Sequence, residues 1–350
     1  MSAPHLLPIA LTPGDPCGIG PEILAKAWLQ APQLTRGCFV AGDVGVMRRA
    51  AALVAPSVGL PVCAITSAAE AWQVPARCLP VLQVVDAAPV LPCGQIDARA
   101  GRLAAECVVW ATRAALRGEV AAMVTAPLHK EALHAAGAPY NQYPGHTELL
   151  QAEAARHQGV SISNLPVRMM LANDELRVVL VSIHVSLRDA LEAITVARVL
   201  QTLRITDASL TPVLGRRPRI ALAGVNPHAG EGGLFGREEI DILQPCMALA
   251  RQEGLEVHGP YAPDTVFMRA RKQPDGRQEF DVVIAMYHDQ GLIPVKYLGV
   301  DLGVNVTLGL PLIRTSPDHG TAMDVAGQGV ANANSLIQAI GMARELCGHA

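Results

Sequence analysis

The sequence predicts an α/β protein of two lobes built on largely parallel sheets. The chain has 350 residues, which exceeds the usual size of one hydrophobic core. Half of the residues are hydrophobic but only 3% are aromatic, so aliphatic side chains must form the core. That composition suits helices packed on a buried sheet. Short apolar runs alternate with helical stretches along the chain, and this alternation favours parallel strands.

Short apolar or β-branched runs predict the strands. They lie at 6–12, 38–41, 123–125, 178–183, 220–225, 282–286 and 304–308, and each is followed closely by Gly, Pro, Asp, Asn or His. Helical patterns are clearest at 23–30, 98–116, 187–203 and 332–346. The polar stretch 271–278 contains Pro274-Asp275-Gly276 and predicts a turn or an excursion. Functional loops of parallel sheets lie beyond the carboxyl ends of the strands, so polar residues just after these runs are candidates for a site.

Composition disfavours several classes of function. The formal net charge of −3 leaves no basic excess to neutralise phosphates, so we expect no nucleic-acid partner. No apolar stretch reaches about 18 residues, and the amino terminus lacks the pattern of a secretory signal. We therefore expect a cytoplasmic protein with no membrane span. The eight cysteines are scattered without a C-x-x-C pair, which predicts structural thiols rather than a zinc cluster or a nucleophile.

The first glycine-rich loop follows the strand expected at 6–12. Gly18-Ile19-Gly20 lacks the third glycine of a Rossmann fingerprint, because Ile23 stands at that position. Two interpretations remain open. The glycines can form a tight turn that begins a helix, or the loop backbone and Asp15 can face a bound substrate or cofactor.

The segment 143–148 is the second candidate. It precedes a helix that we expect to begin near Leu149, which places His146 and Thr147 at a helix start. Free backbone N–H groups and the helix dipole favour an anion there, with the imidazole and hydroxyl as further donors. The alternative is a Thr147 that caps the helix beside a packing His146.

Three histidines follow predicted strands, and they could converge at one sheet edge: His184, His228 and His288. Neutral imidazoles suit Zn²⁺ and other borderline divalent ions, and three of them leave coordination positions for a substrate. Packing or capping histidines are the alternative, since these positions are far apart along the chain.

Three polar residues interrupt apolar sequence near the carboxyl end. Asn305 lies inside the strand expected at 304–308, Arg314 follows Pro311-Leu312-Ile313, and Lys296 precedes both. A polar group embedded in apolar sequence needs a partner. A planar guanidinium can grip a carboxylate or a phosphate with two hydrogen bonds. The other interpretation is that these three are ordinary polar residues on the protein surface.

Several long motifs occur in one order along nearly the whole chain: GDPCGIGPE, TAPLHKEALHAAG, YPGHTELL, VNPHAGEGGLFG, PDTVF, MYHDQGLIPVK and GVNVTLGLPLIRTSPDHGTAMD. With these motifs the chain resembles the 4-hydroxythreonine-4-phosphate dehydrogenase family, which includes relatives that oxidise threonate or erythronate 4-phosphate. The resemblance implies the two-lobed fold of isocitrate and isopropylmalate dehydrogenases, which is not a Rossmann fold. We expect one lobe at 1–130 plus 303–350 and a second at 131–302 that carries most ligands, with the active site in the cleft between them.

The resemblance also implies roles for named residues. A divalent metal, Zn, Co, Mn or Mg, is expected on His184, His228 and His288. Substrate contacts are implied for His146, Thr147, Lys296, Asn305 and Arg314. Lys296, Asp289 and Asp264 are the candidate catalytic groups, the two carboxylates in supporting roles. The family works as a homodimer with the active site at the subunit boundary, so the partner chain is expected to contribute groups; the cofactor-binding residues are unknown.

The activity implied is metal-dependent oxidation of 4-hydroxythreonine 4-phosphate or a close analogue with NAD or NADP, followed by decarboxylation of the β-keto acid. One alternative is a D-threonate or D-erythronate 4-phosphate dehydrogenase of sugar-acid catabolism, which the sequence at 138–144 resembles more closely. A second is a cis-dihydrodiol dicarboxylate dehydrogenase, which Gly145-His146-Thr147-Glu148 disfavours because that substrate has no phosphate. A third is a silent metabolite-binding protein, which the three histidines and Lys296 disfavour.

Overall fold

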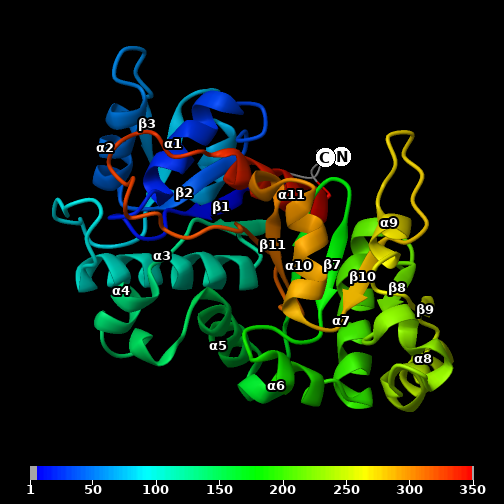
Figure 1. The fold of residues 1–350 in the computed structure, drawn as a ribbon. Helices are drawn as coiled ribbons and strands as arrows, with labels where there is room; N and C mark the ends of the chain where they lie inside the picture. The colour runs from blue at the N-terminus through cyan, green and yellow to red at the C-terminus, as the bar shows by residue number, and fades with distance from the viewer. Residues whose placement is uncertain (1–5, 349–350) are drawn as a thin grey trace. The chain divides into compact units, whose positions relative to one another are not determined.

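The computed structural model describes residues 6–348, which divide into two compact units (Figure 1). The first unit comprises the described residues up to Pro166 together with those from Leu310 onward, and the second is Val167–Gly309. We expected divisions at 130/131 and 302/303, whereas the units divide after Pro166 and after Gly309. No helix within residues 6–348 is long and apolar enough to cross a membrane.

The sheet of the first unit is entirely parallel and fully buried along its central strands. Its order is β3-β4-β2-β1-β5-β12. The usual Rossmann order is 3-2-1-4-5-6, so the expectation of a different topology is confirmed. The strands are β1 (Ile9–Thr12), β2 (Cys38–Gly42), β3 (Val62–Ile65), β4 (Leu79–Gln83), β5 (Ala122–Thr125) and β12 (Arg314–Pro317).

Helices of the first unit pack closely through small residues. Gly101 of α3 lies so near α4 that a Cβ there would overlap the backbone of Ala132 and Leu133. Helix α5 also packs against α3, which is why the chain up to Pro166 belongs to this unit. The helices are α1 (Gly20–Gln30), α2 (Val44–Val54), α3 (Ala98–Leu116), α4 (Lys130–Ala135), α5 (His146–Gln158) and α11 (Asn334–Leu346), with short 3₁₀ turns η1 (Ala68–Trp72), η2 (Tyr140–Gln142) and η3 (Ile162–Asn164).

The sheet of the second unit is mixed, in the order β11-β6-β7-β10-β8-β9. Strands β7, β10, β8 and β9 run parallel, whereas β6 is antiparallel to both β11 and β7. The strands are β6 (Arg168–Ala172), β7 (Arg177–Leu180), β8 (Ile220–Ala223), β9 (Val257–Tyr261), β10 (Val282–Ala285) and β11 (Val304–Leu308). The prediction of an α/β protein with largely parallel sheets is confirmed.

One predicted helix is wrong. The expected helix at 187–203 is broken between Glu192 and Val196, where Thr195 adopts an extended backbone and its hydroxyl accepts a 3.3 Å hydrogen bond from Arg198 N as the cap of the next helix. The helical elements of this unit are α6 (Leu187–Glu192), α7 (Val196–Leu214), α8 (Gln244–Gln252), α9 (Val266–Ala270) and α10 (His288–Tyr297), with η4 (Pro227–Gly233), η5 (Glu239–Leu243) and η6 (Val300–Leu302).

The polar stretch 271–278 is an excursion between α9 and β10, as expected, and Figure 1 draws it in yellow as a projecting loop. Gln273 N donates to Arg277 O at 2.8 Å and Gly276 N donates to Gln273 O at 2.8 Å, so a local turn closes its tip.

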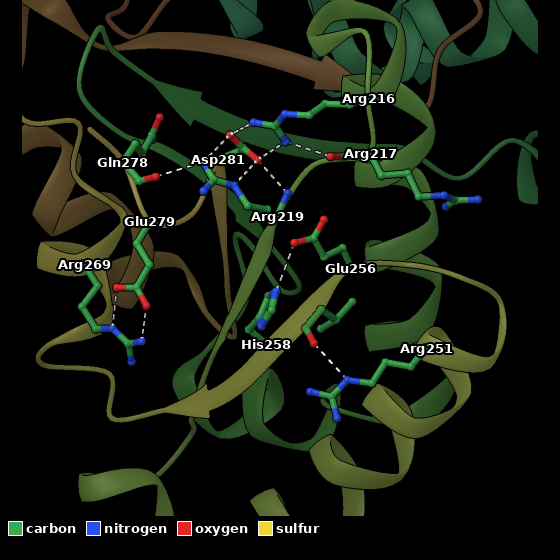
Figure 2. Close-up of polar contacts among 11 residues, drawn as sticks. Arg216, Arg217, Arg219, Arg251, Glu256, His258, Arg269, Gln278, Glu279 and Asp281 are labelled. Carbon is green, nitrogen blue, oxygen red and sulfur yellow. Dashed lines mark hydrogen bonds and ion pairs between the residues drawn. The ribbon is translucent and has the colours of Figure 1, made fainter. Parts of the chain in front are cut away.

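A buried carboxylate joins the amino ends of β8 and β10 (Figure 2). The side chain of Asp281 is 5% exposed and accepts hydrogen bonds from Arg216 Nη1 and Nη2 at 2.8 Å and from Arg219 N at 2.7 Å. Burial alone would raise the pKa of this carboxyl, but the hydrogen bonds from Arg216 and Arg219 outweigh it and hold the pKa at about 2. The ionised form therefore stabilises the fold.

We predict that Asp281→Asn lowers the free energy of unfolding at pH 7 by about 2 kcal/mol, because the pKa is about two units below that of an unfolded aspartate. The contribution is fully present above about pH 4 and is lost as the pH falls towards 2. Urea unfolding of both proteins across this range checks the prediction. A difference that stays constant from pH 4 to pH 2 would contradict it.

Candidate functional site

The three strand-following histidines lie where the sequence predicted. Strands β7, β10 and β8 are parallel neighbours, with Ala285 beside Leu180 and Ile284 beside Leu222, so their carboxyl ends share one edge of the sheet. His184 follows β7, His288 begins α10 just after β10, and His228 lies in η4 after β8.

Two of these histidines face each other. The ring centres of His184 and His288 are 5.7 Å apart, and both rings line a cavity of about 280 Å³ with Ser182, Tyr287 and Asp289 among its walls. Among the described residues nothing hydrogen-bonds the buried hydroxyl of Ser182. Two imidazoles on one tetrahedral Zn²⁺, with Zn–N bonds of about 2.0–2.1 Å, place their ring centres on the order of 5 Å apart. The pair therefore fits a shared cation.

The third histidine is not part of that pair. The ring of His228 lies 6.3 Å from that of Phe235, and within residues 6–348 of a single chain no three His, Cys, Asp or Glu side chains are grouped as a metal would require. One chain thus brings two of the three expected ligands together.

Backbone strain occurs at two of the expected ligands. His184 and His228 both have φ of 52°, in the left-handed region that L-residues avoid. Such a conformation costs roughly 1–2 kcal/mol per residue and persists only where the surroundings fix it, as they often do at functional sites. Packing alone does not require a histidine at such a position.

Asp289 is placed to orient His288. The distance from His288 Nδ1 to Asp289 Oδ1 is 2.7 Å. Because a carboxylate can only accept, Nδ1 is the donor in this contact, which leaves Nε2 as the ring nitrogen available to a ligand. Lys296 is half-buried in the last turn of α10 and Asn305 is half-buried in β11, whereas Asp264 is exposed in the loop before α9.

A second polar region lies in the first unit. Gly145 is the N-cap of α5, so the helix begins at His146, three residues before the expected start. Thr147 is therefore not the capping residue, and that alternative is wrong. Arg314 begins β12 and is only 4% exposed; its Nε and Nη2 donate to Thr125 Oγ1 at 3.1 and 2.7 Å.

Burial sets the charges of this region. It holds the pKa of His146 well below its usual value, and the nearby Arg314 cation lowers that pKa further, so the imidazole is neutral at pH 7. Burial also lowers the pKa of Arg314 to about 10, partly offset by Glu148, and the guanidinium stays protonated. The region thus contains the buried cation of Arg314 and the neutral imidazole of His146.

Shielded polar atoms occur at the end of β1, in the loops after β1 and β5, and at the start of α5. Thr12 Oγ1, Asp15 Oδ2, His129 Nδ1 and His146 Nε2 have no hydrogen-bond partner among the described residues. Burial raises the pKa of Asp15 although Cys17 N donates to its other oxygen at 2.9 Å. Buried polar atoms are normally satisfied, so these mark a place for a polar ligand or water. The sequence analysis singled out Asp15 and His146 but missed Thr12 and His129, of which His129 follows a predicted strand closely.

The first glycine-rich loop has a packing role. A Cβ on Gly18 would lie 2.9 Å from Thr321 O, and one on Gly20 would overlap Pro13 O. Glu22 then accepts hydrogen bonds from the N–H groups of Gly327 and Gly329. The tight-turn interpretation is confirmed, and the shielded Asp15 carboxylate agrees with the other interpretation as well.

The cysteines form no disulfide bond within residues 6–348. All eight are free thiols, and burial raises the pKa of both Cys17 and Cys38 to about 12. Thiols with such a pKa are poor nucleophiles.

Comparisons with known proteins agree with these features. Residues 34–343 match the family described as Pyridoxal phosphate biosynthetic protein PdxA. The chain is 47% identical to the 4-hydroxythreonine-4-phosphate dehydrogenase of Beijerinckia indica, covering 97% of this chain and 95% of that protein. It is 46% identical to the D-threonate 4-phosphate dehydrogenase of Salmonella typhimurium, covering 97% and 98%.

A solved structure is similar over the same extent. The crystal structure of 4-hydroxythreonine-4-phosphate dehydrogenase from Klebsiella pneumoniae matches with a TM-score of 0.83 and 42% identity, over 97% of this chain and 99% of that one. With a family match over most of its length and relatives this similar, the chain belongs to the Pyridoxal phosphate biosynthetic protein PdxA family of dehydrogenases.

Proposed function

We propose that the chain oxidises a 4-phosphorylated hydroxy acid with NAD or NADP, in a reaction that needs a divalent metal ion and ends in decarboxylation. The observation that carries this proposal is the pair of facing imidazoles, His184 and His288, beside a cavity at the edge of a parallel sheet. Membership of a dehydrogenase family supports the reaction class.

His184, His228 and His288 would hold the metal. The bound ion supplies Lewis-acid chemistry, lowering the pKa of the substrate hydroxyl and stabilising the charge that develops on decarboxylation. Asp289 would orient His288 so that Nε2 is available to the ion, because its carboxylate accepts the hydrogen bond that Nδ1–H donates. As the family resemblance implies, we propose a homodimer in which the second copy contributes to the site.

The phosphate would bind the donors of the first unit. The start of α5 has backbone N–H groups without intrahelical partners, and His146 and Thr147 add a ring N–H and a hydroxyl. Arg314 adds a buried positive charge. Lys296 and Asn305 would bind the remaining polar groups of the substrate, as the family resemblance implies.

Oxidation releases a hydride and a proton. The nicotinamide supplies the hydride acceptor when it is bound. Lys296 is our candidate for the group that takes the proton, and Asp264 and Asp289 are assigned supporting roles.

The preferred substrate is 4-hydroxythreonine 4-phosphate, with D-threonate or D-erythronate 4-phosphate as the first alternative. Relatives of both names are almost equally similar to this chain, at 47% and 46% identity. The rival substrates differ by one polar group, an amine or a hydroxyl. A site built to bond one of them rejects the other strongly, because buried polar groups are left unpaired.

A panel of substrates tests this choice. We expect reduction of NAD or NADP with one or more 4-phosphorylated acids in the presence of Zn²⁺, Co²⁺, Mn²⁺ or Mg²⁺. Turnover of an aromatic cis-dihydrodiol dicarboxylate alone would instead support the second alternative. Binding without turnover of any compound would support the silent metabolite-binding protein.

We predict that chelation abolishes activity and that added divalent metal restores it. His184→Ala, His228→Ala and His288→Ala should each remove most of the metal affinity, measured by titration of the metal-free protein, because each deletes a ligand. His157→Ala is the matched control, since His157 is exposed in the last turn of α5. Full activity in metal-stripped enzyme would refute the mechanism, and stoichiometric metal in two of the three variants would mean that the ligands are misassigned.

We predict that the phosphate and its donors act as one unit. Charge-assisted hydrogen bonds contribute roughly 1.5–3 kcal/mol each, so losing two should lower kcat/KM by about 10² to 10⁴. Removing the phosphate from the substrate, or combining His146→Ala with Thr147→Val, should each have this effect. When the double variant is tested on the substrate without its phosphate, kcat/KM should fall by far less than the product of the two separate fold-losses. Independent, multiplicative losses would show that His146 and Thr147 do not hold the phosphate.

A further inference from the structure

The loop that carries His228 has a left-handed backbone conformation, which L-residues rarely adopt. From His228 to Gly232 every φ is positive, with values of 52°, 54°, 80°, 43° and 67°. Glycine adopts this region freely, but His228, Ala229 and Glu231 do not. Some other interaction must therefore hold the segment in place.

Glu239 provides that interaction from η5. Its side chain is 2% exposed, and Oε1 accepts from Val225 N at 2.7 Å and from Asn226 N at 2.8 Å. Oε2 accepts from Asn226 Nδ2 at 2.9 Å. Gly230 of the loop also lies close to this carboxylate: a Cβ built on Gly230 would be 2.8 Å from Glu239 Oε2. One buried carboxylate thus fixes the amino-terminal end of the turn around His228 and lies close to Gly230 in its middle.

Gln290 connects this loop to the strand that leads to His288. Its Nε2 donates to Gly224 O at 2.8 Å and its Oε1 accepts from Met286 N at 2.6 Å. Gly224 directly follows β8, and Met286 directly follows β10. The amide therefore fastens the ends of two neighbouring strands from within the first turn of α10.

We propose that Glu239 and Gln290 are positioning residues that hold His228 and His288 in the geometry a divalent cation requires, without touching the cation. This inference rests on the proposed metal-dependent function. Some polar groups hydrogen-bond a metal ligand and orient it. Removing such a group typically weakens metal binding roughly 10- to 100-fold. A purely structural role would lower stability and leave the affinity of the folded protein unchanged.

Two variants remove the contacts. Glu239→Ala deletes the acceptor of the two backbone N–H groups, and Gln290→Met deletes both hydrogen bonds of the amide while keeping its length. Glu239→Gln is the conservative rescue variant, because its amide oxygen can still accept from Val225 N and Asn226 N. Asp281→Asn is the matched control: it alters a buried carboxylate at the opposite, amino ends of the same two strands.

The experiment is a titration of the full-length, metal-free protein with Co²⁺, followed by calorimetry and by the visible absorption of the bound ion, with urea unfolding of each variant without metal. We expect Glu239→Ala and Gln290→Met to weaken Co²⁺ binding roughly 10- to 100-fold and to change the absorption spectrum. Glu239→Gln should stay within a few-fold of the unmodified chain. Asp281→Asn should lose stability but keep both affinity and spectrum.

Two different failures are distinguishable. If the unmodified chain does not bind Co²⁺, or if His228→Ala and His288→Ala bind it unchanged, the proposed function fails and this inference fails with it. If those histidine variants lose the metal but Glu239→Ala and Gln290→Met keep full affinity and spectrum, only the positioning role is refuted. A loss of affinity in Asp281→Asn as large as in Glu239→Ala would also refute it, since general destabilisation would then account for the effect.

Discussion

Parallel pairing of β7, β10 and β8 is the constraint on which the candidate site of the second unit depends. Parallel strands end at a common edge, so any residue just after each strand is brought to that edge regardless of its distance along the chain. Polar side chains hold the alignment at both ends, one of them buried and the other half-buried. Asp281 joins the amino ends of β8 and β10 (Figure 2), and Gln290 joins their carboxyl ends.

The two units offer different chemistry. The first provides a buried guanidinium, a neutral imidazole and a helix start, which together suit an anion with several acceptor oxygens. The second provides imidazoles at one edge of a parallel sheet, and imidazole is a ligand that suits a borderline divalent cation.

Local sequence predicted elements with a clear hydrophobic period. The strand Val304–Leu308, in which apolar residues alternate with Asn305 and Thr307, and the helix Ala98–Leu116 have the expected bounds. Strand β9 was missed because Gly259-Pro260 interrupts it, and β12 was missed because Arg-Thr-Ser-Pro is a polar sequence whose burial depends on its neighbours. The break before α7 depends on the backbone of Thr195, which helical spacing does not reveal.

The same distinction applies to the candidate site: its local features were predicted from the sequence, and its contacts between distant segments were not. The positions of His184, His228 and His288 after strands followed from pattern alone, because a strand and the residue after it are local features. The left-handed backbone of His184 and the role of Glu239 did not, since they depend on contacts between distant segments. Glu239 is one of two adjacent glutamates, and only the fold shows that it is buried and accepts from Val225 and Asn226.

X-ray absorption of the Zn²⁺-loaded protein tests the central claim most directly, because it reports the ligands of the ion itself. Coordination by three imidazoles predicts nitrogen and oxygen scatterers only, at about 2.0–2.1 Å, with the outer-shell features of histidine rings. The spectrum should lose ring features in His288→Ala. A sulfur shell at about 2.3 Å, or a spectrum without imidazole features, would contradict the three-histidine site.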